Sequence, residues 1–113
     1  MIKFNHFNFN VLDLDKSLDF YKKALGLEPV RVKDAEDGSF RLVYLGDGLT
    51  EFQLELTWLR DRKEPYNLGE CEFHLAFHTD EYEQLHQKHQ DMGCICFDGA
   101  IRQVHFFSPD RPS

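Results

Sequence analysis

The stretch HFNFNVLDLDKSLDFYKKALG, residues 6–26, passes from the alternation of a strand to the spacing of a helix within a few residues. Apolar and polar side chains alternate over residues 4–12, which predicts a strand. Asp13 or Asp15 is then expected to cap a helix, and Gly26 to end it. The apolar face of that helix is predicted to consist of Leu14, Leu18, Tyr21 and Leu25. The stretch therefore predicts a strand followed at once by an amphipathic helix.

The rest of the chain supplies more strands and a second copy of this order. Strands are expected at 28–34, 40–45, 51–58, 72–78, 94–97 and 101–107. A polar linker that contains Pro and Gly separates the two halves at residues 59–71. In the second half, Asp80 is expected to cap a helix that Gly93 ends. The spacing from His6 to Gly26 nearly equals that from His74 to Gly93, which indicates an internal duplication.

Composition narrows the class of protein. The chain has 113 residues, the size of one domain, 1–113, and 42% of its residues are hydrophobic, enough for a core. A net charge of -7 argues against nucleic acid and anionic membrane surfaces as partners, and no apolar run approaches the length of a membrane span. The three cysteines lack CxxC spacing and predict free thiols in a reducing compartment, so we expect a cytoplasmic protein.

Three residues of metal-ligand type lie on polar strand faces. Residues two apart in a strand share a face. In strands 4–12, 51–58 and 72–78, one face is apolar, and the other carries His6, Glu55 and His74, respectively. A polar face on a sheet is often only its solvent side, which is the alternative to a ligand site.

Several longer stretches together carry a resemblance to a known family. They are HFNFNVLDLDKSLDFYKKALGLEPV near the start, FQLELTW in the middle and PYNLGECEFHLAFHTD after the linker. The chain resembles the glyoxalase I branch of the vicinal oxygen chelate, or glyoxalase–bleomycin resistance–dioxygenase, superfamily. That resemblance covers about residues 4–110 and implies an α+β fold. It implies two paired βαβββ modules, 4–58 and 72–113, that form a cupped mixed sheet around one divalent metal.

The resemblance also implies a site and a chemistry. It makes His6, Glu55 and His74 ligands of Ni, Co or Zn, and Glu55 the catalytic residue that carries a proton. A Glu in the LELT strand is similar to glyoxalase I, whereas methylmalonyl-CoA epimerases place Gln there. The implied activity is that of lactoylglutathione lyase, which converts the hemithioacetal of methylglyoxal and glutathione, or another thiol, to the S-lactoyl thioester. A homodimer that binds a small-molecule substrate is expected.

The chain departs from the family pattern at its end. The family has a second Glu ligand on an eighth strand, whereas this sequence reads FFSPDRPS and stops at residue 113. The second module is therefore expected to lack its last strand, and the chain to isomerise the hemithioacetal poorly or not at all. His105 is a candidate substitute ligand. Residues 94–107 are expected either to mediate oligomerisation or to be poorly ordered. The alternative is a non-catalytic ligand-binding or resistance-type protein of the same superfamily.

The thiol-binding residues differ as well. Bacterial relatives have Arg four residues after the first His and Asn four residues after the strand Glu, where this chain has Asn10 and Leu59. The carboxylates of glutathione would then need other partners. The candidates are the linker cations Arg60, Arg62 and Lys63.

Overall fold

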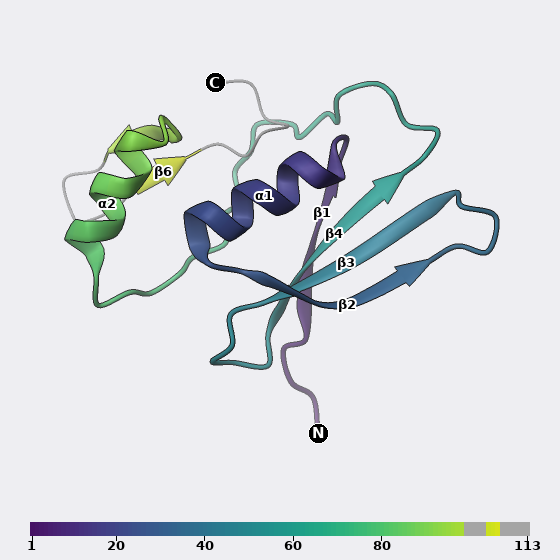
Figure 1. Ribbon diagram of the computed structural model, residues 1–113, viewed down its shortest axis with the longest axis horizontal. Helices are drawn as coiled ribbons and strands as arrows, with labels where there is room; N and C mark the ends of the chain where they lie inside the picture. The colour runs from purple at the N-terminus through teal and green to yellow at the C-terminus, as the bar shows by residue number, and fades with distance from the viewer. Residues whose placement is uncertain (99–103, 107–113) are drawn as a thin grey trace. The chain divides into compact units, whose positions relative to one another are not determined.

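A computed structural model describes residues 1–98 and 104–106 of the chain (Figure 1). The chain divides into two compact units, Met1–Pro65 and Tyr66–Ser113, which are described separately below. The division falls inside the polar segment 59–71. In the part of the chain that the structure describes, no helix has the length and apolar character needed to cross a membrane.

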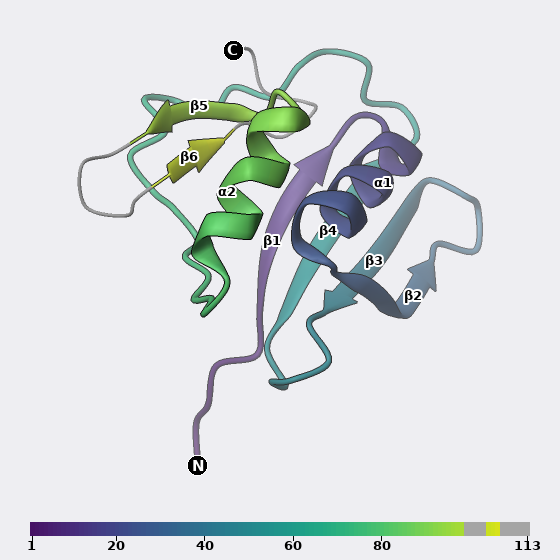
Figure 2. The same ribbon diagram turned by 60° about the vertical axis from the view of Figure 1, so that its left-hand side comes forward.

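The first unit is a four-stranded mixed sheet with one helix. Its elements in chain order are β1 (His6–Val11), α1 (Leu14–Leu25), β2 (Glu28–Asp34), β3 (Phe40–Gly46) and β4 (Gln53–Leu59). The strands lie in the order β1-β4-β3-β2, with β1 parallel to β4 and the other pairs antiparallel (Figure 2). The sequence patterns located these strands and the helix within one or two residues. A βαβββ unit of α+β class is thus confirmed.

The ends of α1 are set by two residues of the opening stretch. Asp13 is the N-cap, and its side chain accepts a hydrogen bond from the Lys16 backbone N–H at 3.0 Å. Asp15 lies in the first turn of the helix, where its negative charge interacts favourably with the helix dipole. At the other end Gly26 adopts the left-handed conformation with φ 69°, which a side chain would strain.

The helix packs on the sheet through smaller side chains than the sequence predicts. Of the predicted face, only Tyr21 is buried; Leu14, Leu18 and Leu25 are half-buried at its flanks. The centre of the contact is formed by Ser17 and Ala24, both fully buried. Small residues at the centre allow the helix backbone to approach the sheet closely, because a leucine there would hold the two apart.

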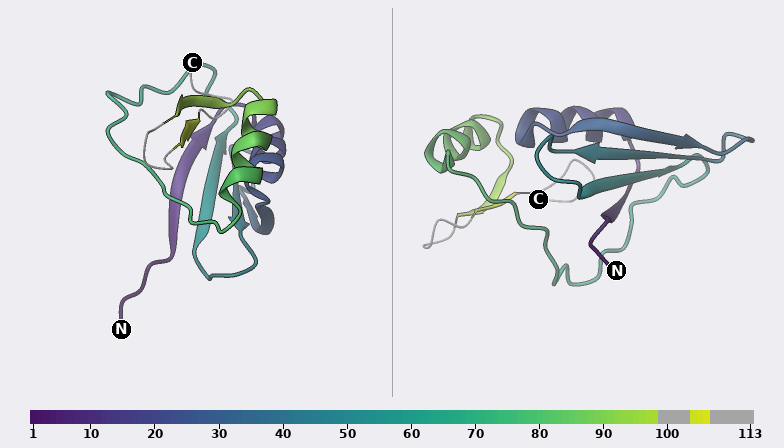
Figure 3. Two further views of the ribbon diagram at one scale, coloured as in Figure 1. Left: turned by 90° about the vertical axis from the view of Figure 1, so that its left-hand side faces the viewer. Right: turned by 90° about the horizontal axis from the view of Figure 1, so that it is seen from below.

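The core of this unit lies between α1 and one face of the sheet (Figure 3). Its buried sheet residues are Val11, Val43, Leu45, Leu54 and Leu56. Leu54 and Leu56 alternate along β4 with Gln53, Glu55 and Thr57, which are only partly buried. The alternation places the polar side chains on the face that α1 does not cover.

The second unit contains α2 (Tyr82–Asp91), β5 (Ile95–Asp98) and β6 (Val104–Phe106), with β5 and β6 paired antiparallel. The expected cap Asp80 is wrong: the N-cap is Glu81, which makes no side-chain cap hydrogen bond. Thr79 instead accepts a hydrogen bond from the Glu81 backbone N–H at 3.0 Å. The helix ends just before Gly93, which has φ 67° as a stop residue should.

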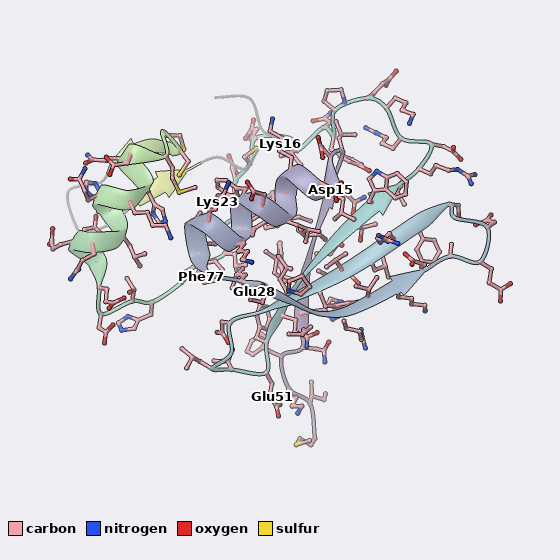
Figure 4. All side chains as sticks on the ribbon, viewed as in Figure 1. Asp15, Lys16, Lys23, Glu28, Glu51 and Phe77 are labelled. Atoms are coloured by element: carbon pink, nitrogen blue, oxygen red, sulfur yellow. The ribbon has the colours of Figure 1, made fainter. Side chains whose placement is uncertain are left out.

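The predicted strand 72–78 is also wrong, because residues 71–79 form no strand in the structure. A strand is defined by its ladder, and β1 obtains its ladder from β4, where His6 pairs with Gln53. Phe73 and Phe77 are each 50% exposed in this segment, and Phe77 is labelled in Figure 4. The predicted strand 94–97 corresponds to β5 within one residue. Of the predicted strand 101–107, residues 104–106 form β6, and residues 101–103 and 107 lie outside the described residues.

Candidate metal centre

Six polar side chains share the uncovered face of β1 and β4. The parallel register pairs His6 with Gln53, Asn8 with Glu55, and Asn10 with Thr57. Residues paired in this way point to the same side of a sheet. The structure therefore brings two of the predicted ligands, His6 and Glu55, to one face from positions far apart in the sequence.

His6 is exposed at the start of β1, and one of its ring nitrogens is already engaged. Its Nδ1 lies 2.5 Å from the side-chain oxygen Oδ1 of Asn5. Because that oxygen can only accept, Nδ1 is the donor in this contact, and Nε2 is the ring nitrogen left for a metal ion. Metal-binding histidines have this arrangement, with one nitrogen donating to an oxygen and the other facing the ion. The His6 ring also meets the Tyr44 ring edge-on, with 5.5 Å between centroids.

Glu55 is half-buried in the middle of β4, between Asn8 on one neighbouring strand and Tyr44 on the other. A hydrogen bond from the Tyr44 hydroxyl to the Glu55 carboxylate, together with burial, raises the pKa of Tyr44. The Arg31 guanidinium lies over the Tyr44 ring, 3.9 Å from its centroid, and opposes that rise. Sequence analysis missed Tyr44, because only the register of β3 with β4 pairs it with Glu55.

A side-chain network joins β1 to β4 beside this pair. The Thr57 hydroxyl donates to Asn8 Oδ1 at 2.6 Å, and Asn8 Nδ2 donates to Asn10 Oδ1 at 2.8 Å. Each of these hydrogen bonds joins side chains of the polar face. They therefore hold β1 and β4 together on the face that carries His6 and Glu55. Asn10 is held in this network by its amide oxygen.

His74, the third predicted ligand, is exposed and belongs to the unit Tyr66–Ser113. Its place relative to His6 and Glu55 therefore stays a prediction. Within residues 1–98 and 104–106, no three His, Cys, Asp or Glu side chains gather as a metal-binding group. The donor chemistry of His6 and Glu55, an imidazole with a free Nε2 and a carboxylate, fits a borderline divalent ion such as Zn or Ni.

Two of the linker cations, Arg60 and Arg62, make hydrogen bonds within or close to the linker. Arg60 pairs with Asp61 at 3.1 Å and donates to the Asp37 backbone carbonyl at 2.8 Å. The pKa of Asp61 is lowered, and the largest cause is the hydrogen bond that Arg60 donates to its carboxylate. Arg62 donates to the backbone carbonyls of Glu64 and Pro65. These contacts hold the two arginines on the loop itself, and their role toward a thiol stays a prediction.

Comparisons with known proteins agree with this fold. A family model described as "Glyoxalase/Bleomycin resistance protein/Dioxygenase superfamily" matches residues 3–96. A lactoylglutathione lyase of Neisseria meningitidis is 40% identical over 80 residues, 67% of this chain and 56% of that protein. A probable lactoylglutathione lyase of Synechocystis is 36% identical over 92 residues, 78% of this chain and 68% of that protein. The chain thus spans little more than half the length of the Neisseria relative.

The fold recurs in a solved structure of the trypanothione-dependent glyoxalase I of Leishmania major. That structure is 24% identical and has a TM-score of 0.84, covering 97% of this chain and 81% of its own. At this level of identity the likeness concerns the fold.

Proposed function

The chain belongs to the Glyoxalase/Bleomycin resistance protein/Dioxygenase superfamily, and on that premise we propose that it is a metal-dependent isomerase of the lactoylglutathione lyase type. Its substrate is the hemithioacetal of methylglyoxal with glutathione or another low-molecular-weight thiol, and its product the S-lactoyl thioester. The observation that carries the proposal is the placement of an imidazole and a carboxylate, His6 and Glu55, on one uncovered sheet face. His74 is proposed as the third ligand.

His6 and Glu55 have separate roles in the proposed reaction. When bound, a divalent ion such as Ni, Co or Zn supplies Lewis-acid stabilisation of the oxygens that become negative. His6 presents Nε2 to the ion, because Nδ1 is held by Asn5. Glu55 removes the proton from the carbon that bears sulfur and returns it to the neighbouring carbon, so no proton is gained or lost overall. The half-buried position of Glu55 limits water around it.

The activity is tested by mixing the purified chain with methylglyoxal, glutathione and each metal in turn, and following thioester formation. Loss of a general base typically lowers the rate by about 10²–10⁴-fold, so we expect Glu55→Gln to fall by that factor. Glu51→Gln is the matched control. Glu51 lies on the loop before β4, labelled in Figure 4, and pairs only with the exposed Lys3 among the described residues.

A second candidate function is a binding protein without chemistry. The family description names bleomycin resistance proteins beside glyoxalases, so the same fold serves ligand binding alone. If the chain forms no thioester above the uncatalysed rate with any of the three metals, the isomerase proposal is refuted. Binding of the hemithioacetal or of glutathione, measured by calorimetry, would then favour the second candidate.

We also propose a homodimer in a reducing compartment such as the cytoplasm. The three cysteines form no disulfide, and Cys94 is a buried thiol whose pKa is raised by desolvation, which makes it unreactive. Sedimentation velocity at micromolar concentration tests the dimer. A monomer over the whole concentration range would contradict it.

A further inference from the structure

Tyr44 is buried on the sheet face that α1 does not cover. It is only 5% exposed, whereas the polar residues around it on β1 are exposed. The helix α1 packs on the opposite face of the sheet, and side chains of the polar face lie against the Tyr44 ring. Two of them are the Arg31 guanidinium above the ring and the His6 imidazole at its edge.

These two contacts give the ring a defined position. A guanidinium over an aromatic face is attracted by the ring electrons, and an edge-on imidazole fills the remaining side. Tyr44 is also the direct cross-strand partner of Glu55. The ring is therefore held beside Glu55, and hydrogen bonding to the Glu55 carboxylate is the largest cause of the raised pKa of the Tyr44 hydroxyl.

We propose that Tyr44 is a positioning residue that holds the Glu55 carboxylate in one orientation for a divalent metal ion, with Arg31 fixing the Tyr44 ring. The proposal rests on the proposed function only in taking Glu55 as a metal ligand. It assigns to Tyr44 no contact with the metal or the substrate.

The chemistry of the hydroxyl suits this role. A glutamate side chain is long and loses rotamer freedom when it is ordered, so a hydrogen bond that orders it beforehand favours metal binding. A phenol is a neutral donor, so it orders the carboxylate without cancelling the negative charge that attracts the cation. An arginine or lysine bonded to Glu55 would cancel that charge, and Arg31 lies over the ring of Tyr44 instead.

The test compares Tyr44→Phe with Tyr21→Phe. Both variants lose one hydroxyl from a buried tyrosine. Tyr21, however, is a residue of α1, which packs on the sheet face opposite to Glu55. Tyr44→Phe keeps the ring and hence its contacts with Arg31 and His6. Affinity of the full chain for Ni and Zn ions alone is measured by isothermal titration calorimetry. Hydrogen-bond partners of metal ligands typically contribute about 10–100-fold to affinity, so that loss is expected for Tyr44→Phe and none for Tyr21→Phe.

A second readout needs no metal. NMR couplings of the Glu55 side chain in the metal-free chain should report one rotamer in the wild type and an average of several in Tyr44→Phe. If the wild type binds metal and Tyr44→Phe binds it within about twofold, the positioning role is refuted. If the wild type binds no metal, the ligand assignment in the proposed function fails, and the couplings alone decide. Equal averaging in both proteins would then overturn the role of Tyr44.

Discussion

Replacement of Leu56 by Ala should remove a large share of the stability of the first unit. Leu56 is fully buried in β4, between the site residues Glu55 and Thr57 in sequence but on the opposite face of the sheet. It pairs with Phe9 on β1 and with Val43 on β3, so strands on both sides hold its surroundings in place. The cavity that the substitution leaves cannot easily close.

The magnitude follows from the atoms removed. Leu→Ala deletes three carbons, and each buried carbon contributes about 0.8 kcal/mol, or about 2.4 kcal/mol for the side chain. An unrelaxed cavity adds to this, so we expect the free energy of unfolding to fall by about 3–4 kcal/mol, within the range known for such changes. A domain of this size is stable by about 5–15 kcal/mol in total, so the loss is easily measured.

The assay is urea denaturation followed by Trp58 fluorescence, since this residue lies in the same strand. Leu49→Ala is the matched control, because Leu49 is 91% exposed on the loop before β4. We expect that control to change stability by less than about 0.5 kcal/mol. A loss below about 1 kcal/mol for Leu56→Ala would show that β4 does not lie at the centre of the core.

Two further predictions concern polar contacts of the same unit. Thr57→Val removes the hydroxyl that donates to Asn8 and should lower the free energy of unfolding in urea by about 1 kcal/mol. Thr57→Ser keeps the hydroxyl and should lower it by less. Equal losses in the two variants would contradict the role of the hydroxyl. The Asp47 carboxylate accepts hydrogen bonds from the backbone N–H groups of Thr50 and Leu49, which lower its pKa. Because the folded pKa lies below the unfolded value of about 3.9, this stability is present above that pH and is lost as the pH falls through the folded pKa. Asp47→Asn should therefore be less stable than the wild type near neutral pH, and this difference in stability should become smaller in acid. A difference that stays constant with pH would refute the stabilising role of the Asp47 carboxylate.

In the first unit the sequence was informative where the signal is local. Alternation located β1 and β4, and the pair of a capping aspartate and a stop glycine, Asp13 and Gly26, bounded α1. Such signals depend on backbone hydrogen bonds within a few residues, so no knowledge of the fold is needed to read them. The same alternation placed His6 and Glu55 on polar strand faces before their strands were known to be neighbours.

Tertiary structure decided what depends on distant partners. The face of α1 centres on Ser17 and Ala24 because closeness to the sheet outweighs hydrophobicity, and only the packed sheet shows that closeness. Segment 72–78 has the alternation of a strand but no ladder, because a strand requires a neighbour that the pattern itself cannot supply. Tyr44 meets Glu55 only through the register of β3 with β4, since hydrogen bonding between strands, and not spacing along the chain, sets which side chains touch.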